Sequence, residues 1–260
     1  MEIPFFHIDA FTGEVFSGNP AGVCLLAHWP VDALLQQIAA ENNLPETAFI
    51  VQQGESYAIR WFSPQTEIDL CGHATLAAAY ALFNSMGFPE PVITFVSPCS
   101  GKLQVGRKDY LYTLDFPSRP AVACDPIALL TRALGVSPLE TWRAADYLCV
   151  FVSEDEVRSL RPDFSLLRSL DLRGVIATAR GKKHDFVSRF FAPALGIDED
   201  PVTGSSHCTL IPYWQEKLQK KRLHALQVSA RGGELFCEYL GERVSIAGRA
   251  VCYLQGTIAI

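Results

Sequence analysis

Two segments of the chain repeat one pattern, and this repeat limits the possible folds more than any other feature. The first comprises Arg60–Pro64 (RWFSP) and Thr66–Leu76, and the second comprises Arg189–Pro193 (RFFAP) and Asp198–Leu210. The offset is 189 − 60 = 129 residues in a chain of 260. A half-length repeat predicts two similar lobes that face each other and share one cleft. We expect the N-terminal lobe to span 1–118 and the C-terminal lobe 119–260, with the last strand a candidate to return to the first lobe.

Short alternating stretches dominate the chain and predict strands. Gly, Pro and polar turns separate many of them, which favours hairpins over βαβ units. The expected strands are 58–62, 92–96, 110–116, 175–179, 185–191, 226–230, 234–239, 243–247 and 250–255. Amphipathic patterns predict helices over 31–41 and 126–134, and one or two short helices over 154–170 around Pro162.

Two further helices are expected within the repeated segments. Gly72–Phe83 is almost entirely apolar after its first turn, so it has to be buried on all sides, and a curved sheet wrapped around it would achieve this. Its counterpart, Ser205–Leu218, begins with small polar residues and becomes amphipathic. We therefore predict an α+β fold of two pseudo-symmetric lobes, each a strongly curved sheet or barrel around a central helix. The glycine spacing of 17–22 does not fit a dinucleotide-binding fold.

Composition excludes several classes of function. A net charge of −6 and a pI near 5.5 argue against nucleic-acid and membrane partners. The one basic cluster, 217–222, is interpreted as the solvated end of a helix. The N-terminus lacks the pattern of a signal peptide, and the longest apolar run, 76–83, is too short to span a membrane. The eight cysteines are scattered without metal-ligand spacing, which favours reduced thiols in a cytoplasmic protein and no metal site.

Both repeated segments place a glycine where a helix begins, Gly72 and Gly204. A helix N-terminus offers unpaired N–H groups and a partial positive charge, so both starts are candidate seats for a carboxylate or another anion. Asp69 is interpreted as a helix cap. Asp200 and His73, next to these starts, are candidate proton-transfer groups.

Two other polar residues receive structural interpretations from the residues alone. His207 lies one turn inside its helix, which favours a core or interface position. Glu46 lies between a helix and an apolar strand, and its composition and setting favour an exposed turn residue.

Several motifs together resemble the PhzF (phenazine biosynthesis-like) family, and they occur in order over nearly the whole chain. They are Phe11-Thr12, Phe16–Val23, Asn43–Phe49, Asp69–Thr75 and Glu199–His207. The resemblance implies the diaminopimelate epimerase-like fold, which has two pseudo-symmetric lobes. It also implies a homodimer. The sequence gives no support for a metal, flavin or nicotinamide cofactor, so none is expected.

The resemblance reverses the interpretation of Glu46. The matching glutamate of the phenazine enzyme is a general acid/base that moves a proton between carbons of a cyclohexadiene amino acid. Carried over by motif, Glu46 becomes the catalytic acid/base of an isomerase acting on a small carboxylate-bearing substrate. The catalytic set then also contains His73, Asp200 and Ser205. The implied substrate-binding set is Gly72, Gly204, Asn19, Ser206 and Cys71, with the two glycines supplying backbone N–H groups.

Two alternatives stay open at this point. Related epimerases use two opposed cysteines, and Cys71 occupies one such position, while Thr203 stands at the other. A threonine hydroxyl is a very poor proton shuttle, so an amino-acid-derivative epimerase or racemase would depend on Cys71 with a non-thiol partner. The second alternative is a small-molecule binding protein that has lost its chemistry. Pro45, where many relatives have serine, leaves the substrate undetermined.

Overall fold

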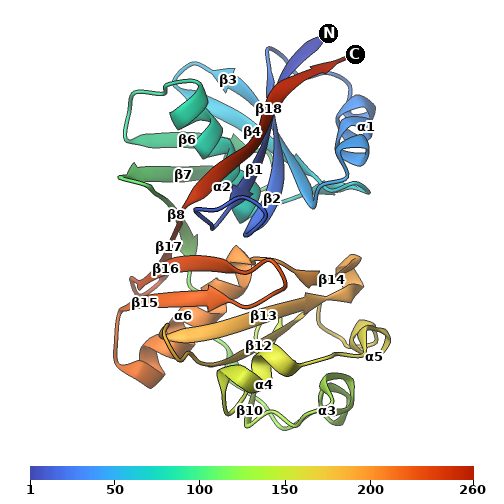
Figure 1. Ribbon diagram of the computed structural model, residues 1–260, viewed down its shortest axis with the longest axis vertical. Coiled ribbons are helices and arrows are strands. Elements are labelled where there is room, and N and C mark those ends of the chain that lie inside the picture. The colour runs from blue at the N-terminus through green and yellow to red at the C-terminus, as the bar shows by residue number, and fades with distance from the viewer. The chain divides into compact units, whose positions relative to one another are not determined.

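The computed structural model describes residues 1–260 and divides into two compact units (Figure 1). The first unit comprises 1–115 together with 247–260, and the second comprises 116–246. The C-terminal strand β18 (Ala250–Ala259) belongs to the first unit because it pairs antiparallel with β1 (Glu2–Ala10). Both units mix strands and helices, which confirms the predicted α+β class.

The first unit is built on a sheet whose strands follow one another almost in chain order. Strand β1 pairs antiparallel with β2, β3 with β4, β6 with β7 and β7 with β8, whereas β2–β3 and β4–β6 are parallel. Its remaining elements are β2 Asn19–Leu26, α1 Asp32–Asn42, β3 Glu46–Gln53, β4 Ser56–Phe62, β5 Glu67–Ile68, α2 Gly72–Tyr80, the π-helical turn η1 Ala81–Ser85, β6 Val92–Ser97, β7 Gly101–Lys108 and β8 Leu111–Pro117, which leads out of the unit.

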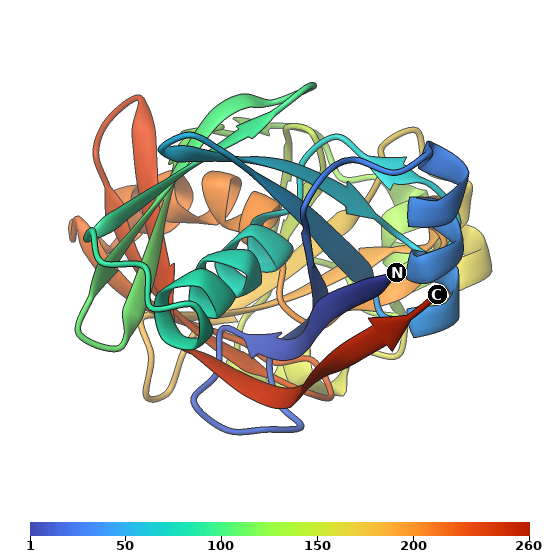
Figure 2. The same ribbon diagram turned by 90° about the horizontal axis from the view of Figure 1, so that it is seen from above.

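Helix α2 is the central element of the first unit, as its sequence predicts. Every residue from His73 to Ala79 is buried. The helix contacts β1, β2, β3, β7 and β18, and strands lie on both sides of it in Figure 2. Because four of its nine residues are alanines with small side chains, the strands can approach its backbone closely.

The second unit repeats the plan with its own helix α6 (Gly204–Leu218). Strands β10–β11, β12–β13 and β15–β16 are antiparallel, and β11–β12 and β13–β15 are parallel. The other elements are β9 Val122–Ala123, α3 Ala128–Leu134, β10 Glu140–Arg143, β11 Tyr147–Val150, α4 Glu154–Ser159, α5 Phe164–Arg168, β12 Val175–Arg180, β13 Phe186–Ala192, the 3₁₀ turn η2 Pro193–Leu195, β14 Ile197–Asp200, β15 Arg222–Gln227, β16 Gly233–Tyr239 and β17 Arg243–Gly248.

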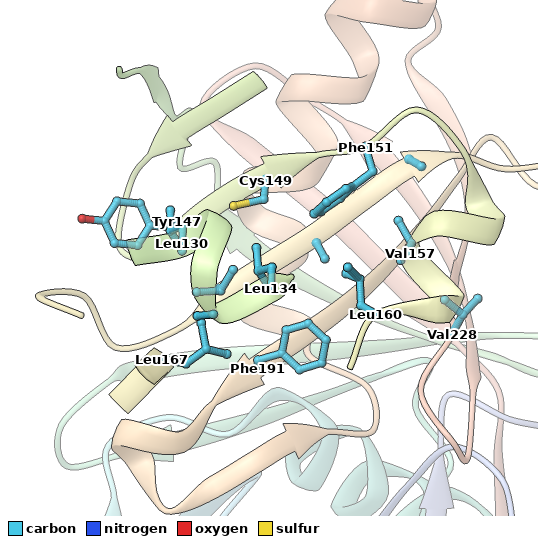
Figure 3. Packing of buried hydrophobic residues seen from close by; sticks show 14 of the residues in the cluster. Leu130, Leu134, Tyr147, Cys149, Phe151, Val157, Leu160, Leu167, Phe191 and Val228 are labelled. Carbon is cyan, nitrogen blue, oxygen red and sulfur yellow. The ribbon is translucent and has the colours of Figure 1, made fainter. Parts of the chain in front are cut away.

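Two packing layers bury the strands of the second unit. Helix α6 contacts β15 and β16, and its Trp214 stacks on Phe186 of β13 with ring centroids 5.7 Å apart. Helices α3, α4 and α5 enclose an apolar cluster that includes Leu134, Val157 and Phe191 (Figure 3). This cluster fixes β12 and β13, and β13 leads through η2 into the segment before α6.

Three expectations from the sequence are wrong in detail. First, helix-containing connections link the parallel pairs, so βαβ units are present beside the hairpins. Local sequence patterns do not reveal these pairings, because the parallel partners are distant in sequence. The strand expected at 226–230 is β15, which begins at Arg222 and ends at Gln227. The basic cluster 217–222 is exposed and begins at the end of α6, as expected, but α6 stops at Leu218 and Gln219 turns the chain with a φ of 51°, so of its basic residues only Lys217 belongs to the helix. No helix of the chain has the length and apolar character needed to cross a membrane.

Candidate active site

The first cluster of predicted site residues lies at the start of α2. Asn19 opens β2 and Glu46 opens β3, and the parallel register sets Ala21 opposite Glu46. His73 lies in the first helical turn, directly after Gly72. Three separate elements therefore bring one amide, one carboxylate and one imidazole together.

Glu46 and His73 form a shielded ion pair. His73 Nε2 lies 3.1 Å from Glu46 Oε2, and the two side chains are 8% and 12% exposed. The interpretation of Glu46 as an exposed turn residue, made from composition, is therefore wrong. It failed because the start of a strand was taken for a turn, while the parallel pairing with β2 keeps the carboxylate inside the unit.

The other ring nitrogen of His73 has two neighbours. Asn19 Nδ2 lies 3.2 Å from Nδ1, and Cys71 Sγ lies 3.5 Å from the same atom. When the ring is neutral, the Asn19 amide donates to Nδ1, and Nε2–H is left to donate to Glu46. When the ring is protonated, Nδ1–H needs an acceptor, and rotation of the amide would present its oxygen there.

The surroundings shift the pKa of both His73 and Cys71. Burial alone would lower the pKa of His73, but the Cys71 sulfur and the Glu46 carboxylate outweigh it and hold that pKa well above its ordinary value. Burial raises the pKa of the Cys71 thiol, the Glu46 charge adds to this, and His73 opposes it. Because the thiol is uncharged at neutral pH, the partner that favours the imidazolium there is Glu46.

Glu46, Cys71 and His73 also offer one donor atom each within 4.8 Å of one another. A transition metal at this point would require a thiolate and a neutral imidazole. Burial, which raises the pKa of the Cys71 thiol, opposes the thiolate. The arrangement therefore favours proton transfer over metal binding.

The second cluster lies at the start of α6. Thr203 Oγ1 donates to Asp200 Oδ2 at 2.5 Å. The fully buried Gln227 ties both residues to β15: its Nε2 donates to Asp200 O at 2.8 Å, and its Oε1 accepts from Thr203 N at 2.9 Å. Asp200 is thus held by the helix start and by a neighbouring strand.

The two predicted serines of this helix have different settings. Ser205 is partly exposed, and Arg173 Nη2 lies 3.4 Å from its Oγ, while the same guanidinium forms a two-bond fork with Asp146 at 2.8 and 2.9 Å. Ser206 is buried, and its hydroxyl donates to Thr203 O at 2.8 Å. Ser205 is therefore the better placed of the two to meet a ligand.

Neither helix start is capped by a side chain. Cys71 and Thr203 are the N-cap residues of α2 and α6, and neither makes a side-chain capping hydrogen bond. Asp69, interpreted as a cap, is exposed, so that interpretation is wrong; it lies too early in the chain to reach the first turn. A Cβ built on Gly204 meets no heavy atom within 4 Å, so packing does not require glycine there. Backbone N–H groups at a helix N-terminus can receive an anion.

Sequence reasoning missed Gln227, Arg173 and Asp146. A signal existed for Gln227, because Leu223, Ala225 and Gln227 alternate on the buried face of β15, and a polar residue on such a face needs a partner. The expected strand at 226–230 does not contain Leu223 or Ala225, so this alternation was not recognised. Arg173 and Asp146 lie 27 residues apart in loops, and nothing local in the sequence marks their contact.

Comparisons with known proteins agree with this fold. The family model described as "Phenazine biosynthesis-like protein" matches residues 8–256. A Pseudomonas aeruginosa protein named "Uncharacterized isomerase" is 52% identical over 100% of both chains. A crystal structure of a PhzF-family phenazine biosynthesis protein from Enterococcus faecalis has a TM-score of 0.98 and 48% identity, covering 100% of both chains.

The fold also extends to more distant structures. A hydroxyproline epimerase from Agrobacterium vitis matches 100% of this chain and 93% of its own, with a TM-score of 0.64 and 10% identity. That likeness shows the fold alone, and it confirms the predicted epimerase-like architecture. The fold and the relatives together define an isomerase. The chain belongs to the phenazine biosynthesis-like (PhzF) family, as the motifs predicted.

Proposed function

We propose that the chain moves a proton on a small carboxylate-bearing substrate, with Glu46 as the general acid/base and without a cofactor. The observation that carries this proposal is the shielded Glu46 carboxylate, 3.1 Å from His73 Nε2 and beside the uncapped start of α2. A carboxylate in such a setting can take a proton from carbon and return it to another position.

His73 has a positioning and electrostatic role in this proposal. Its raised pKa favours the imidazolium, which stabilises the ionised Glu46 between turnovers. As Glu46 takes up the substrate proton, the imidazolium loses its ionic partner and a negative charge develops on the substrate. The same cation can then stabilise that charge electrostatically.

The substrate carboxylate is proposed to bind at an uncapped helix start, where backbone N–H groups of Gly72 or Gly204 are available. Asp200 and Ser205 flank the start of α6 and are proposed to orient polar groups of the substrate. That both helix starts serve one substrate stays a prediction of the sequence repeat, and the homodimer stays a prediction of the family resemblance.

A second candidate, an epimerase that uses Cys71 as a base, is favoured by one contact, the 3.5 Å approach of Cys71 Sγ to His73 Nδ1. The raised pKa of the buried thiol argues against it, because little thiolate is present at neutral pH. In the sequence repeat, the position that corresponds to Cys71 is Thr203, whose hydroxyl is already hydrogen-bonded to Asp200.

Proton NMR in D2O tests the proposal directly. The purified chain is incubated with a panel of small amino and hydroxy acids that includes a cyclohexadiene amino acid. We expect deuterium to enter a carbon position of at least one compound, and Glu46→Gln to abolish this exchange while the variant still folds. Exchange that survives in Glu46→Gln and disappears in Cys71→Ala would overturn the proposal in favour of the epimerase. Compounds that raise the thermal stability without any exchange would favour a binding protein.

A further inference from the structure

We propose that His184, His224 and Glu234 form a binding site for a divalent transition metal ion of the zinc type. None of the three belongs to the motifs that carry the isomerase site. All three lie in the second unit and are partly exposed. The site would tie a turn to the face of a sheet.

The three residues come from neighbouring elements. His184 lies in the turn between β12 and β13. Strand β15 is parallel to β13, and the antiparallel register with β16 pairs His224 with Phe236 and Leu226 with Glu234. His224 and Glu234 therefore lie diagonally on the same, partly exposed face of the sheet, within reach of each other.

Their donor atoms are already close together. His224 Nε2 lies 2.8 Å from Glu234 Oε1, and one donor atom of each of the three residues lies within 4.8 Å of the others. The rings of His184 and His224 have centroids 4.6 Å apart. A tetrahedral ion with bonds of about 2.0–2.2 Å holds its donors roughly 3.4 Å apart. Partly exposed side chains can close the remaining ångström or so by rotation about their χ angles.

The backbone around the cluster is held in place before any ion binds. Asp185, next to His184, donates its N–H to His224 O at 2.8 Å and accepts from His224 N through Oδ2 at 2.7 Å. The His224 ring also stacks on Phe236, with centroids 4.7 Å apart and planes 8° from parallel. The turn and the strand are thus fastened together, so the cost of ordering the ligands is small.

The donor set selects the class of metal. Two imidazoles and one carboxylate suit zinc and its neighbours in the first transition row, whereas calcium and magnesium prefer all-oxygen sites. Three protein ligands leave a fourth position of a tetrahedral ion for water or another ligand. Without a metal, the same residues would form a His224–Glu234 hydrogen bond with His184 packed beside it. Titration with a metal ion distinguishes this arrangement from a metal site.

The test uses the full chain after treatment with EDTA, titrated with ZnCl2 by calorimetry and with CoCl2 by absorption spectroscopy. We expect saturable zinc binding that His184→Gln and His224→Gln each weaken by roughly tenfold or more. His28, an exposed histidine outside the cluster, supplies the matched control His28→Gln, which should bind like the unmodified chain.

The cobalt spectrum distinguishes this site from the cysteine-containing cluster at Glu46. Cobalt bound by His184, His224 and Glu234 should give ligand-field bands without a thiolate-to-metal charge-transfer band. Zinc binding that is equal in the unmodified chain and in both cluster variants would overturn the proposal. A thiolate charge-transfer band lost only in Cys71→Ala, or no binding at all, would do so too.

Discussion

Arg189 holds Glu199 in a two-bond fork, with Nε–Oε1 at 2.7 Å and Nη2–Oε2 at 2.8 Å. Arg60 forms the same fork with Glu67 in the other copy of the repeat, at 2.6 and 2.7 Å. The two pairs differ in their setting: Glu199 is 20% exposed and Glu67 is 40% exposed. Arg189 also donates to the carbonyls of Val157 and Leu160.

This difference in exposure predicts that replacing Arg189 by methionine lowers the free energy of unfolding more than the same substitution at Arg60. Arg189→Met leaves a largely buried carboxylate and two carbonyls without their donor, so we expect a loss of about 3–5 kcal/mol in the free energy of unfolding. Arg60→Met breaks a more exposed fork, for which we expect about 1 kcal/mol. Urea unfolding of both variants provides the comparison. Equal losses would contradict the argument from burial.

Gln227 should support both stability and activity, because it fixes the segment that carries Asp200. Gln227→Leu removes the partners of Thr203 N and Asp200 O from a fully buried position. We expect a loss of about 1–3 kcal/mol in the free energy of unfolding, together with a raised KM in the deuterium-exchange assay. Gln104→Leu, on an exposed part of β7, is the control and should change neither quantity. An unchanged KM in a folded Gln227→Leu protein would show that the position of Asp200 does not affect substrate binding.

The Glu46–His73 ion pair can be tested through the titration of the imidazole. In the folded protein the pKa of His73 is raised, so this group contributes stability below the ordinary histidine pKa and loses it as the pH rises through the folded value. Glu46→Gln removes the carboxylate charge, and we expect the pKa of His73 to fall. Histidine NMR signals followed against pH in both proteins provide the measurement. A His73 pKa that stays raised in Glu46→Gln would assign the effect to another group.

The sequence repeat was sufficient to locate two corresponding helix starts, because both copies carry the same local pattern of residues. It predicted the starts of α2 and α6 and the buried character of α2, since apolar periodicity and glycine placement are local signals. The family motifs then singled out Glu46, which composition alone assigned to an exposed turn.

The strand pairings and side-chain contacts that the sequence did not predict join residues far apart in the chain. The parallel strands β2–β3 and β13–β15 join segments separated by helices, so their register depends on packing. Gln227 reaches Thr203 across 24 residues, and Arg173 reaches Asp146 across 27. Such contacts follow from the fold and leave no periodic trace in the sequence.

His207 should make the stability of the protein fall in mild acid. Its Nδ1–H donates to Thr203 O at 2.8 Å, while Nε2 is buried without a hydrogen-bond partner, which suits only the neutral ring. Burial lowers the pKa of His207 to about 4. Between the ordinary histidine pKa of about 6.5 and this value, the unfolded chain binds a proton that the folded chain does not. The stability contribution is therefore complete above about pH 6.5 and is lost as the pH falls toward 4, by about 3 kcal/mol in all.

The variant His207→Asn isolates this effect, because an asparagine amide can still donate to Thr203 O but does not titrate. The smaller side chain should lower the stability at every pH through the cavity that it leaves. The informative quantity is the slope: from pH 7 to pH 5 the unmodified protein should lose more of its unfolding free energy than His207→Asn does. His28→Asn, at an exposed position, is the matched control and should follow the unmodified protein. Parallel curves for the unmodified protein and His207→Asn would show that the buried ring does not govern acid stability.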